Sequence, residues 1–233
     1  MSASNCRLLF FVRYPLAGQT KTRLIPAIGA IAAANLQRQM AEYILQRLQG
    51  LPTEPFWQKE GDRNSSWHLQ VCFTGSSLAK MRDWLGEDLG YRQQSSGDLG
   101  ERLWNGFRWG FEEGCDRIIA IGADCPSLTT HHIQQAFEQL LYQDVVLGPA
   151  RDGGYYLIGL SHPHSRPFCQ SFLDRQALFQ NIDWSTSRVF QQTRVKACQM
   201  GFSVAQLEML ADVDRPQDLA IWEQLQAVTT SNL

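Results

Sequence analysis

Several basic side chains gather in a short loop near the start of the chain. Residues 14–24 read YPLAGQTKTRL and contain Gly18, Lys21 and Arg23, and Arg13 directly precedes them. Cationic side chains just before a helix can converge on one anion, because the helix N-terminus adds its own unpaired N–H groups. The loop therefore predicts a phosphate site, and a surface turn with solvated charges is the alternative.

Two well-defined phosphate loops do not fit this stretch. The Walker loop requires GxxxxGK[ST], but its two glycine positions before Lys21 hold Pro15 and Thr20. The dinucleotide fingerprint GxGxxG is absent as well, because Gly18 stands alone in the loop. The pattern thus indicates neither a P-loop NTPase nor a dinucleotide-binding enzyme.

Acidic residues follow two later apolar segments. In IGADCPSL, Asp124 is placed to hold a divalent cation against a diphosphate, and a turn before Pro126 is its alternative role. LADVDRPQDL holds Asp212 and Asp214 before the last helix. For Asp214, an N-cap is the first interpretation and a metal ligand the second.

The segment RDGGYYLIGL combines an acid, two glycines and aromatic rings. Gly153 and Gly154 can bring the backbone close to a ligand, with Asp152 beside it and two tyrosines, Tyr155 and Tyr156, able to pack on a ring. Asp-Gly-Gly is also an ordinary hairpin turn. The segment is therefore either a ligand contact or a turn between strands.

SSGDLGERL has two interpretations as well. Asp98 with Glu101 matches a capping box, which would explain both residues structurally. Gly97 and Gly100 leave room for a nucleobase or ribose.

Strands and helices that would position these loops alternate along the sequence. Apolar runs predict strands at 7–13, 67–75, 117–123, 144–149, 154–160 and 202–208. Helical periodicity predicts helices at 28–48, 98–113, 130–142, 186–199 and from Arg215 onward, and 51–66 is expected to be a surface loop. The order predicts an α/β fold with a mostly parallel mixed sheet and helices on both faces. Ligands then bind beyond the carboxyl ends of strands, at the loops after Arg13, Ala123 and Ala150.

The composition narrows the class of protein. A chain of 233 residues can form a single domain over 1–233, and 21 basic against 23 acidic residues give no general electrostatic reason to bind nucleic acid or a membrane. No segment reaches the roughly 20 apolar residues of a membrane span. The six cysteines form no CxxC pair, which fits a cytoplasmic protein: Cys6, Cys72, Cys115, Cys125, Cys169 and Cys198.

Taken in order from Arg13 to Leu219, these segments resemble the MobA-like and CofC-like branch of the GT-A superfamily, the nucleotide-diphospho-sugar transferase fold. The branch includes nucleotidyltransferases and predicted glycosyltransferases, and the GPARDGGYYLIGL segment is most similar to the latter. The resemblance implies a Rossmann-like GT-A fold that holds a nucleoside diphosphate bridged by Mg²⁺ or Mn²⁺.

The resemblance also implies roles for individual residues. Gly18, Lys21 and Arg23 match the nucleotide-phosphate loop, which Arg13 adjoins, and Gly97 and Asp98 are assigned to the nucleotide. Asp124 matches the metal carboxylate, and Asp214 matches a second ligand found in some relatives. Asp152, Gly153, Gly154 and Tyr155 would line the sugar or acceptor side.

The expected activity is metal-dependent glycosyl transfer from a nucleotide sugar to a small-molecule acceptor. Lys21 and Asp124 would stabilise the leaving diphosphate, and Asp152 would be the general base. The alternative is a nucleotidyltransferase that joins an NTP to a phosphorylated small molecule and releases pyrophosphate. A non-catalytic nucleotide-binding protein is the third hypothesis, and a homodimer stays open. Asp124 lacks the DxD pattern of many GT-A glycosyltransferases, and the G-x-G-x-R-M-x-x-K loop of nucleotidyltransferases is not matched either.

Overall fold

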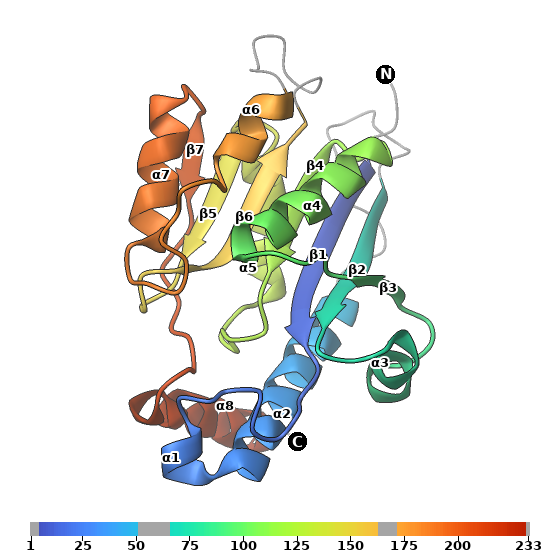
Figure 1. The fold of residues 1–233 in the computed structure, drawn as a ribbon, viewed down its shortest axis with the longest axis vertical. Helices are drawn as coiled ribbons and strands as arrows, with labels where there is room; N and C mark the ends of the chain where they lie inside the picture. The colour runs from blue at the N-terminus through green and yellow to red at the C-terminus, as the bar shows by residue number, and fades with distance from the viewer. Residues whose placement is uncertain (1–4, 51–65, 163–171, 232–233) are drawn as a thin grey trace.

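The computed structural model describes residues 5–50, 66–162 and 172–231. Within them a seven-stranded sheet has the order β3-β2-β1-β4-β6-β5-β7 (Figure 1). The strands are β1 (Asn5–Arg13), β2 (Ser66–Thr74), β3 (Gly90–Gln93), β4 (Arg117–Ile121), β5 (Val145–Pro149), β6 (Tyr155–Ser161) and β7 (Val204–Gln206). Of these described strands, β6 alone pairs antiparallel with its neighbours β4 and β5. The predicted α/β class with a mostly parallel mixed sheet is confirmed.

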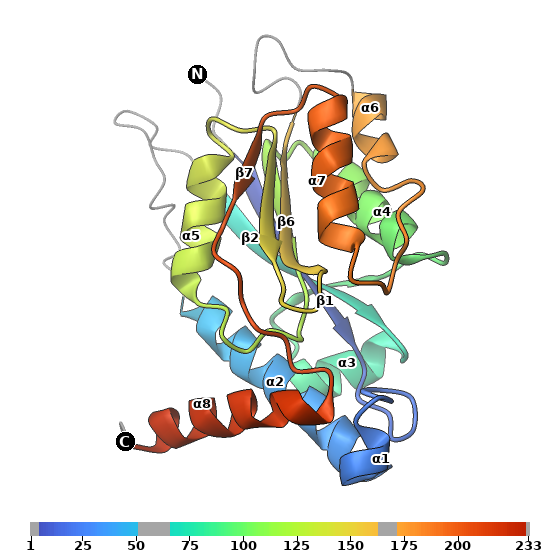
Figure 2. The same cartoon turned by 90° about the vertical axis from the view of Figure 1, so that its left-hand side faces the viewer.

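Helices cover both faces of this sheet (Figure 2). The helices are α1 (Ile25–Ile28), α2 (Ala30–Gln49), α3 (Leu78–Leu85), α4 (Leu99–Glu112), α5 (Thr130–Gln139), α6 (Phe172–Ala177), α7 (Val189–Gln199) and α8 (Leu219–Ser231), with a 3₁₀ turn η2 (Pro216–Asp218) before α8. Figure 2 shows α2, α3 and α5 on one side of the sheet and α4, α6 and α7 on the other.

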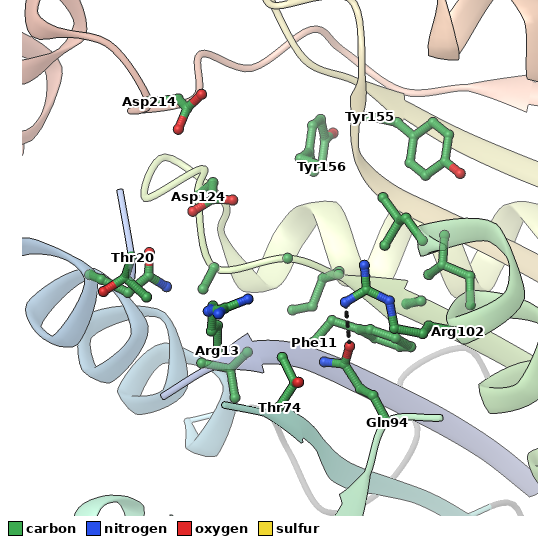
Figure 3. A pocket seen from close by; sticks show the side chains of 18 of the residues that line it. Phe11, Arg13, Thr20, Thr74, Gln94, Arg102, Asp124, Tyr155, Tyr156 and Asp214 are labelled. Carbon is green, nitrogen blue, oxygen red and sulfur yellow. Dashed lines mark hydrogen bonds between the residues drawn. The ribbon is translucent and has the colours of Figure 1, made fainter. Parts of the chain in front are cut away.

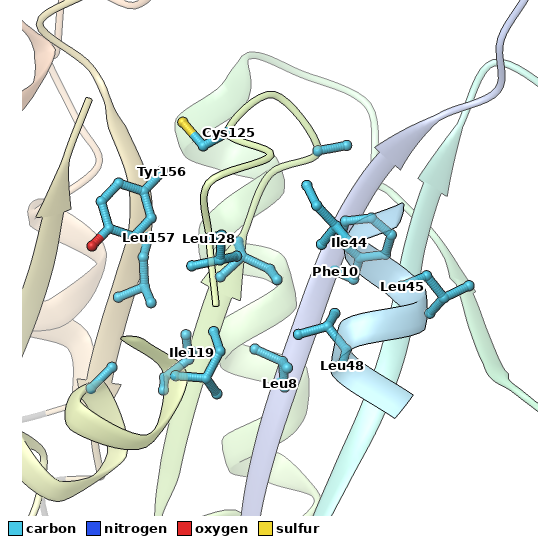
Figure 4. Close-up of a cluster of buried hydrophobic side chains, with 14 of the residues drawn as sticks. Leu8, Phe10, Ile44, Leu45, Leu48, Ile119, Cys125, Leu128, Tyr156 and Leu157 are labelled. Carbon is cyan, nitrogen blue, oxygen red and sulfur yellow. The ribbon is translucent and has the colours of Figure 1, made fainter. Parts of the chain in front are cut away.

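The central strand β1 is buried on both sides, which explains its uninterrupted apolar sequence. Leu8 and Phe10 pack with Ile44 and Leu48 of α2 (Figure 4), whereas Leu9 joins the separate cluster under α4 and α7. Successive residues of a strand point to opposite faces, so a strand covered on both faces must be apolar at every position.

A smaller apolar cluster fixes the segments that carry the site. Leu24, Met40, Val213 and Trp222 pack together, so the loop after β1, helix α2 and the approach to α8 form one buried contact. Trp222 also meets Tyr43 edge to face, with ring centroids 5.4 Å apart. Two segments separated by nearly the whole sequence are thereby held side by side.

Most predicted elements lie where the sequence placed them, with several differences. The helix expected over 28–48 is divided at Gly29, whose φ of 82° ends α1 before α2 begins. The elements α3, β3 and α6 were not predicted. The loop expected at 51–66 and Cys169 lie outside the described residues, apart from Ser66, which begins β2. Among the described residues, no helix has both the length and the apolar character that a bilayer span requires.

Candidate functional site

Two adjoining cavities open where the parallel strands end. The first, about 360 Å³, is bounded by β1, β2, α4 and the loops after β1 and β4 (Figure 3). The second, about 290 Å³, lies between the loop after β4, the turn before β6, residues 184–186 and residues 212–214. Side chains or backbone common to both are Leu99, Gly122, Asp124, Tyr155, Tyr156 and Asp214. Asp124 and Asp214 therefore stand at the junction of the two cavities.

Lys21 joins three segments at this junction. Its Nζ donates to Asp124 Oδ1 at 2.6 Å and to the Val213 carbonyl oxygen at 2.5 Å. The Val213 N–H in turn donates to the Asp124 carbonyl oxygen at 2.8 Å. The Lys21 side chain is 3% exposed and that of Asp124 is 57% exposed, so the ammonium is enclosed while the carboxylate still faces the cavities.

Arg23 and Asp214 form a second ion pair, with Nη1 2.5 Å from Oδ2. The N-cap interpretation of Asp214 is wrong, because the N-cap position of η2 is Arg215. The turn is instead closed by Asp218, whose carboxylate accepts the Arg215 N–H at 2.8 Å. The Asp218 carboxylate also accepts the Asp214 N–H at 3.2 Å. The Asp214 side chain takes no part in closing the turn and is directed to Arg23 and to the cavities.

The turn before β6 shapes the second cavity. Asp152 Oδ1 accepts the Gly154 N–H at 2.7 Å, and Gly153 adopts a φ of 91°. Asp152 lines the cavity together with Asp212. Burial, followed by the nearby Asp152 carboxylate, raises the pKa of the Asp212 carboxyl. Asp212 had received no role from the sequence, although the DVD pattern put it beside Asp214.

The structure brings together most of the predicted site residues. The cavities are lined by Arg13, Lys21, Arg23, Asp124, Asp152, Gly154, Tyr155 and Asp214. The residues that line neither cavity are Gly18, Gly97, Asp98 and Gly153. Asp98 and Glu101 form the predicted capping box, with distances of 2.8 and 2.9 Å, so the Asp98 carboxylate is engaged at the start of α4.

Several polar residues of the first cavity were missed by sequence reasoning, among them Arg102 and Gln94. Arg102 of α4 donates from Nη1 to Gln94 Oε1 at 3.3 Å, and both line the first cavity (Figure 3). Arg102 lies in the GERL segment, whose capping box already had a structural explanation, and Gln94 follows an edge strand without a motif.

Asp124 and Asp214, the two carboxylates at the junction, could bind a divalent cation only if a substrate supplied further ligands. Within the described part of the chain, no group of three or more His, Cys, Asp or Glu side chains is arranged to hold a metal. Mg²⁺, however, is commonly held by one or two carboxylates together with substrate phosphates and water. Asp124 and Asp214 line both cavities and are the candidate carboxylates for such a site. Burial, followed by the Asp124 carboxylate, raises the pKa of the neighbouring Cys125 thiol.

The fold is that of the nucleotide-diphospho-sugar transferase class, as the sequence resemblance implied. The chain belongs to the family described as "Uncharacterized protein conserved in bacteria (DUF2064)", whose model matches residues 59–186.

Several solved structures are similar to this chain. A candidate nucleotide-diphospho-sugar transferase from Desulfovibrio desulfuricans G20 is 32% identical, with a TM-score of 0.76 over 92% of this chain and 84% of that chain. A 4-diphosphocytidyl-2C-methyl-D-erythritol synthase from Anaerococcus prevotii DSM 20548 has 9% identity, a TM-score of 0.57 and 94% coverage of both chains. A CMP:2-keto-3-deoxy-manno-octonic acid synthetase complexed with CTP has 10% identity and a TM-score of 0.54, over 99% of this chain and 100% of that chain. The last two show the fold alone. None of the curated proteins matches the chain.

Proposed function

We propose that the protein is a metal-dependent glycosyltransferase that moves a sugar from a nucleotide-sugar donor to an uncharged, small-molecule acceptor. The relative from Desulfovibrio desulfuricans G20, described as a candidate nucleotide-diphospho-sugar transferase, supports transferase activity on a nucleotide sugar. The choice of glycosyl transfer rests on a feature of this chain, which is the difference in charge between its two cavities.

Among the described residues, the first cavity has more cationic than anionic side chains, and the second has the reverse. Three cations and two carboxylates line the first: Arg13, Lys21, Arg102, Asp124 and Asp214. One cation and four carboxylates line the second: Arg23, Asp124, Asp152, Asp212 and Asp214. A nucleotide diphosphate suits the first cavity, whereas a phosphorylated second substrate would meet like charges in the second.

This difference favours glycosyl transfer over the nucleotidyltransferase alternative. That alternative requires an NTP and a second substrate that itself carries a phosphate. A neutral hydroxyl-bearing acceptor instead finds carboxylates that accept hydrogen bonds, hydroxyls of Ser185 and Thr186, and the rings of Tyr155 and Trp184.

The residues divide the proposed chemistry between them. Lys21 and Arg13 would neutralise the diphosphate that leaves as the glycosidic bond breaks. Asp124 and Asp214 would hold Mg²⁺ or Mn²⁺, which supplies further charge neutralisation when bound. Asp152 would accept the proton of the acceptor hydroxyl, and Asp212, with its raised pKa, is the second candidate for that role.

The test follows product formation from two sets of substrates. The purified protein is incubated with nucleotide sugars and neutral sugars or polyols, and separately with NTPs and sugar phosphates, each with Mg²⁺, Mn²⁺ or EDTA. Metal-dependent release of a nucleoside diphosphate that requires a neutral acceptor supports the proposal. Release of pyrophosphate from the second set would replace it with nucleotidyl transfer, and nucleotide binding without either product would leave a binding protein.

A further inference from the structure

The first cavity has two chemically different ends (Figure 3). Asp124, Asp214 and Thr20 lie at one end, and Gln94 and Arg102 lie at the other. If the diphosphate lies at the end with Asp124, as the proposed function requires, the base of the nucleotide extends toward Gln94 and Arg102.

Gln94 has a fixed orientation at its end of the cavity. Its Nε2 donates to the Cys72 carbonyl oxygen at 2.8 Å, an interaction that the amide oxygen cannot make. Gln94 Oε1 is consequently the atom that accepts from Arg102 Nη1 at 3.3 Å. Arg102 Nε donates to the Asp98 carbonyl oxygen at 3.1 Å, so the guanidinium is held at two points.

The hydrogen-bonding capacity left over on the Arg102 side chain consists of donors. A guanidinium carries five N–H groups, and two of those on Arg102 are engaged within the protein. The remaining N–H groups form part of the planar fork with which arginine binds two adjacent acceptors. Nearby apolar side chains of the same cavity can contact a planar ring: Phe11, Leu99, Leu103 and Ile158.

We propose that Arg102, positioned by Gln94, reads the base of the nucleotide and selects one that presents two adjacent acceptor atoms. Guanine offers O6 and N7, the edge that arginine binds most often in DNA, and cytosine offers O2 and N3. Adenine places an amino group beside its acceptor nitrogen, and uracil places an N–H between its two carbonyls. Either donor would oppose the guanidinium and weaken binding.

The experiment compares affinities for GDP, CDP, ADP and UDP by isothermal titration calorimetry in the presence of Mg²⁺. We expect GDP or CDP to bind roughly tenfold to a hundredfold more tightly than ADP and UDP, the range for one bidentate contact to a base. Arg102→Met should abolish this preference. Arg108→Met, on the same helix but outside the first cavity, is the matched control and should retain it.

Gln94→Met tests positioning separately from contact. It leaves the guanidinium present but without one of its two anchors, so the ratio of GDP or CDP affinity to ADP affinity should fall while ADP affinity stays near the wild-type value. Tightest binding of ADP or UDP, or an unchanged preference in Arg102→Met, overturns the inference. Equal binding of all four nucleotides overturns base selection and leaves the proposed function standing, whereas binding of none overturns both.

Discussion

Lys21 Nζ contacts two groups that the sequence separates widely, the carboxylate of Asp124 at 2.6 Å and the carbonyl oxygen of Val213 at 2.5 Å. An ammonium has three N–H groups, so one remains for a ligand in the first cavity that Lys21 lines. The same side chain thus holds the loops together and, in the proposed function, would offer positive charge to a diphosphate.

Replacing Lys21 by Met should impair both stability and nucleotide binding. The Val213 carbonyl oxygen would lose its donor, which costs about 1–3 kcal/mol of unfolding free energy for a buried group. Urea denaturation measures that loss, and calorimetric titration with a nucleoside diphosphate measures the fall in affinity. Lys80→Met, an exposed lysine on α3, is the control and should change neither quantity. Wild-type affinity in Lys21→Met would remove Lys21 from the phosphate site.

Asp124→Asn should separate metal binding from folding. The asparagine oxygen can still accept from Lys21 Nζ, so we expect a loss of only about 1 kcal/mol in unfolding free energy. The amide is a poorer ligand for Mg²⁺ or Mn²⁺, and the thermal stabilisation by a nucleoside diphosphate should no longer depend on the metal. Asp174→Asn, at an exposed position of α6, is the matched control. Metal dependence that survives in Asp124→Asn would exclude this carboxylate as a ligand.

The sequence predicted the elements that carry strong apolar patterns. β1, buried on both faces, and α4, with its capping box, were both predicted. The edge strand β3 reads GYRQ and has no buried residue, so it carries no apolar pattern to detect. Helix α3 is only eight residues long and has one buried side chain, Met81. Elements that contribute little to the core leave little trace in the sequence.

The sheet topology made it possible to predict that some of the site residues meet, but not that others do. Lys21 and Asp124 follow β1 and β4, which are parallel neighbours, so their loops had to meet at one sheet edge. The pairing of Arg23 with Asp214 depends on packing of α8 against α2, which no local pattern specifies. Arg102 was overlooked because the capping box gave its segment a sufficient structural role.

The raised pKa of Asp212 predicts how stability responds to pH. Its carboxyl binds a proton more tightly in the folded protein than in the unfolded chain, so ionisation above the folded-state pKa opposes folding. Asp212→Asn should therefore be more stable than wild type at neutral pH. The advantage should shrink as pH falls through the folded-state pKa and vanish below the unfolded value of about 3.9. Urea midpoints measured from about pH 3, below the unfolded value, up to neutral pH and above give this curve. Asp214→Asn, whose partner is Arg23, is the comparison and should show no gain at neutral pH.

Gly153 and Gly18 provide a matched pair for testing the turn before β6. Both have positive φ, 91° and 79°, but a Cβ at Gly153 would lie 2.1 Å from the Ser187 carbonyl oxygen, whereas Gly18 faces open space. Gly18→Ala should cost only the backbone strain, about 1 kcal/mol. Gly153→Ala adds a backbone collision and should cost roughly 3 kcal/mol or more, measured by urea denaturation.

The same pair tests what the turn does for the second cavity. Displacing Gly153 from Ser187 would move Asp152, so transfer to the acceptor should fall in Gly153→Ala while affinity for the nucleoside diphosphate stays close to that of wild type. Gly18→Ala tests the loop after β1, which borders the first cavity. Its nucleotide affinity should change only if nucleotide binding requires the positive φ of residue 18. Equal losses of stability in the two alanine variants would contradict the close packing of Gly153 on Ser187, because strain alone would then explain both.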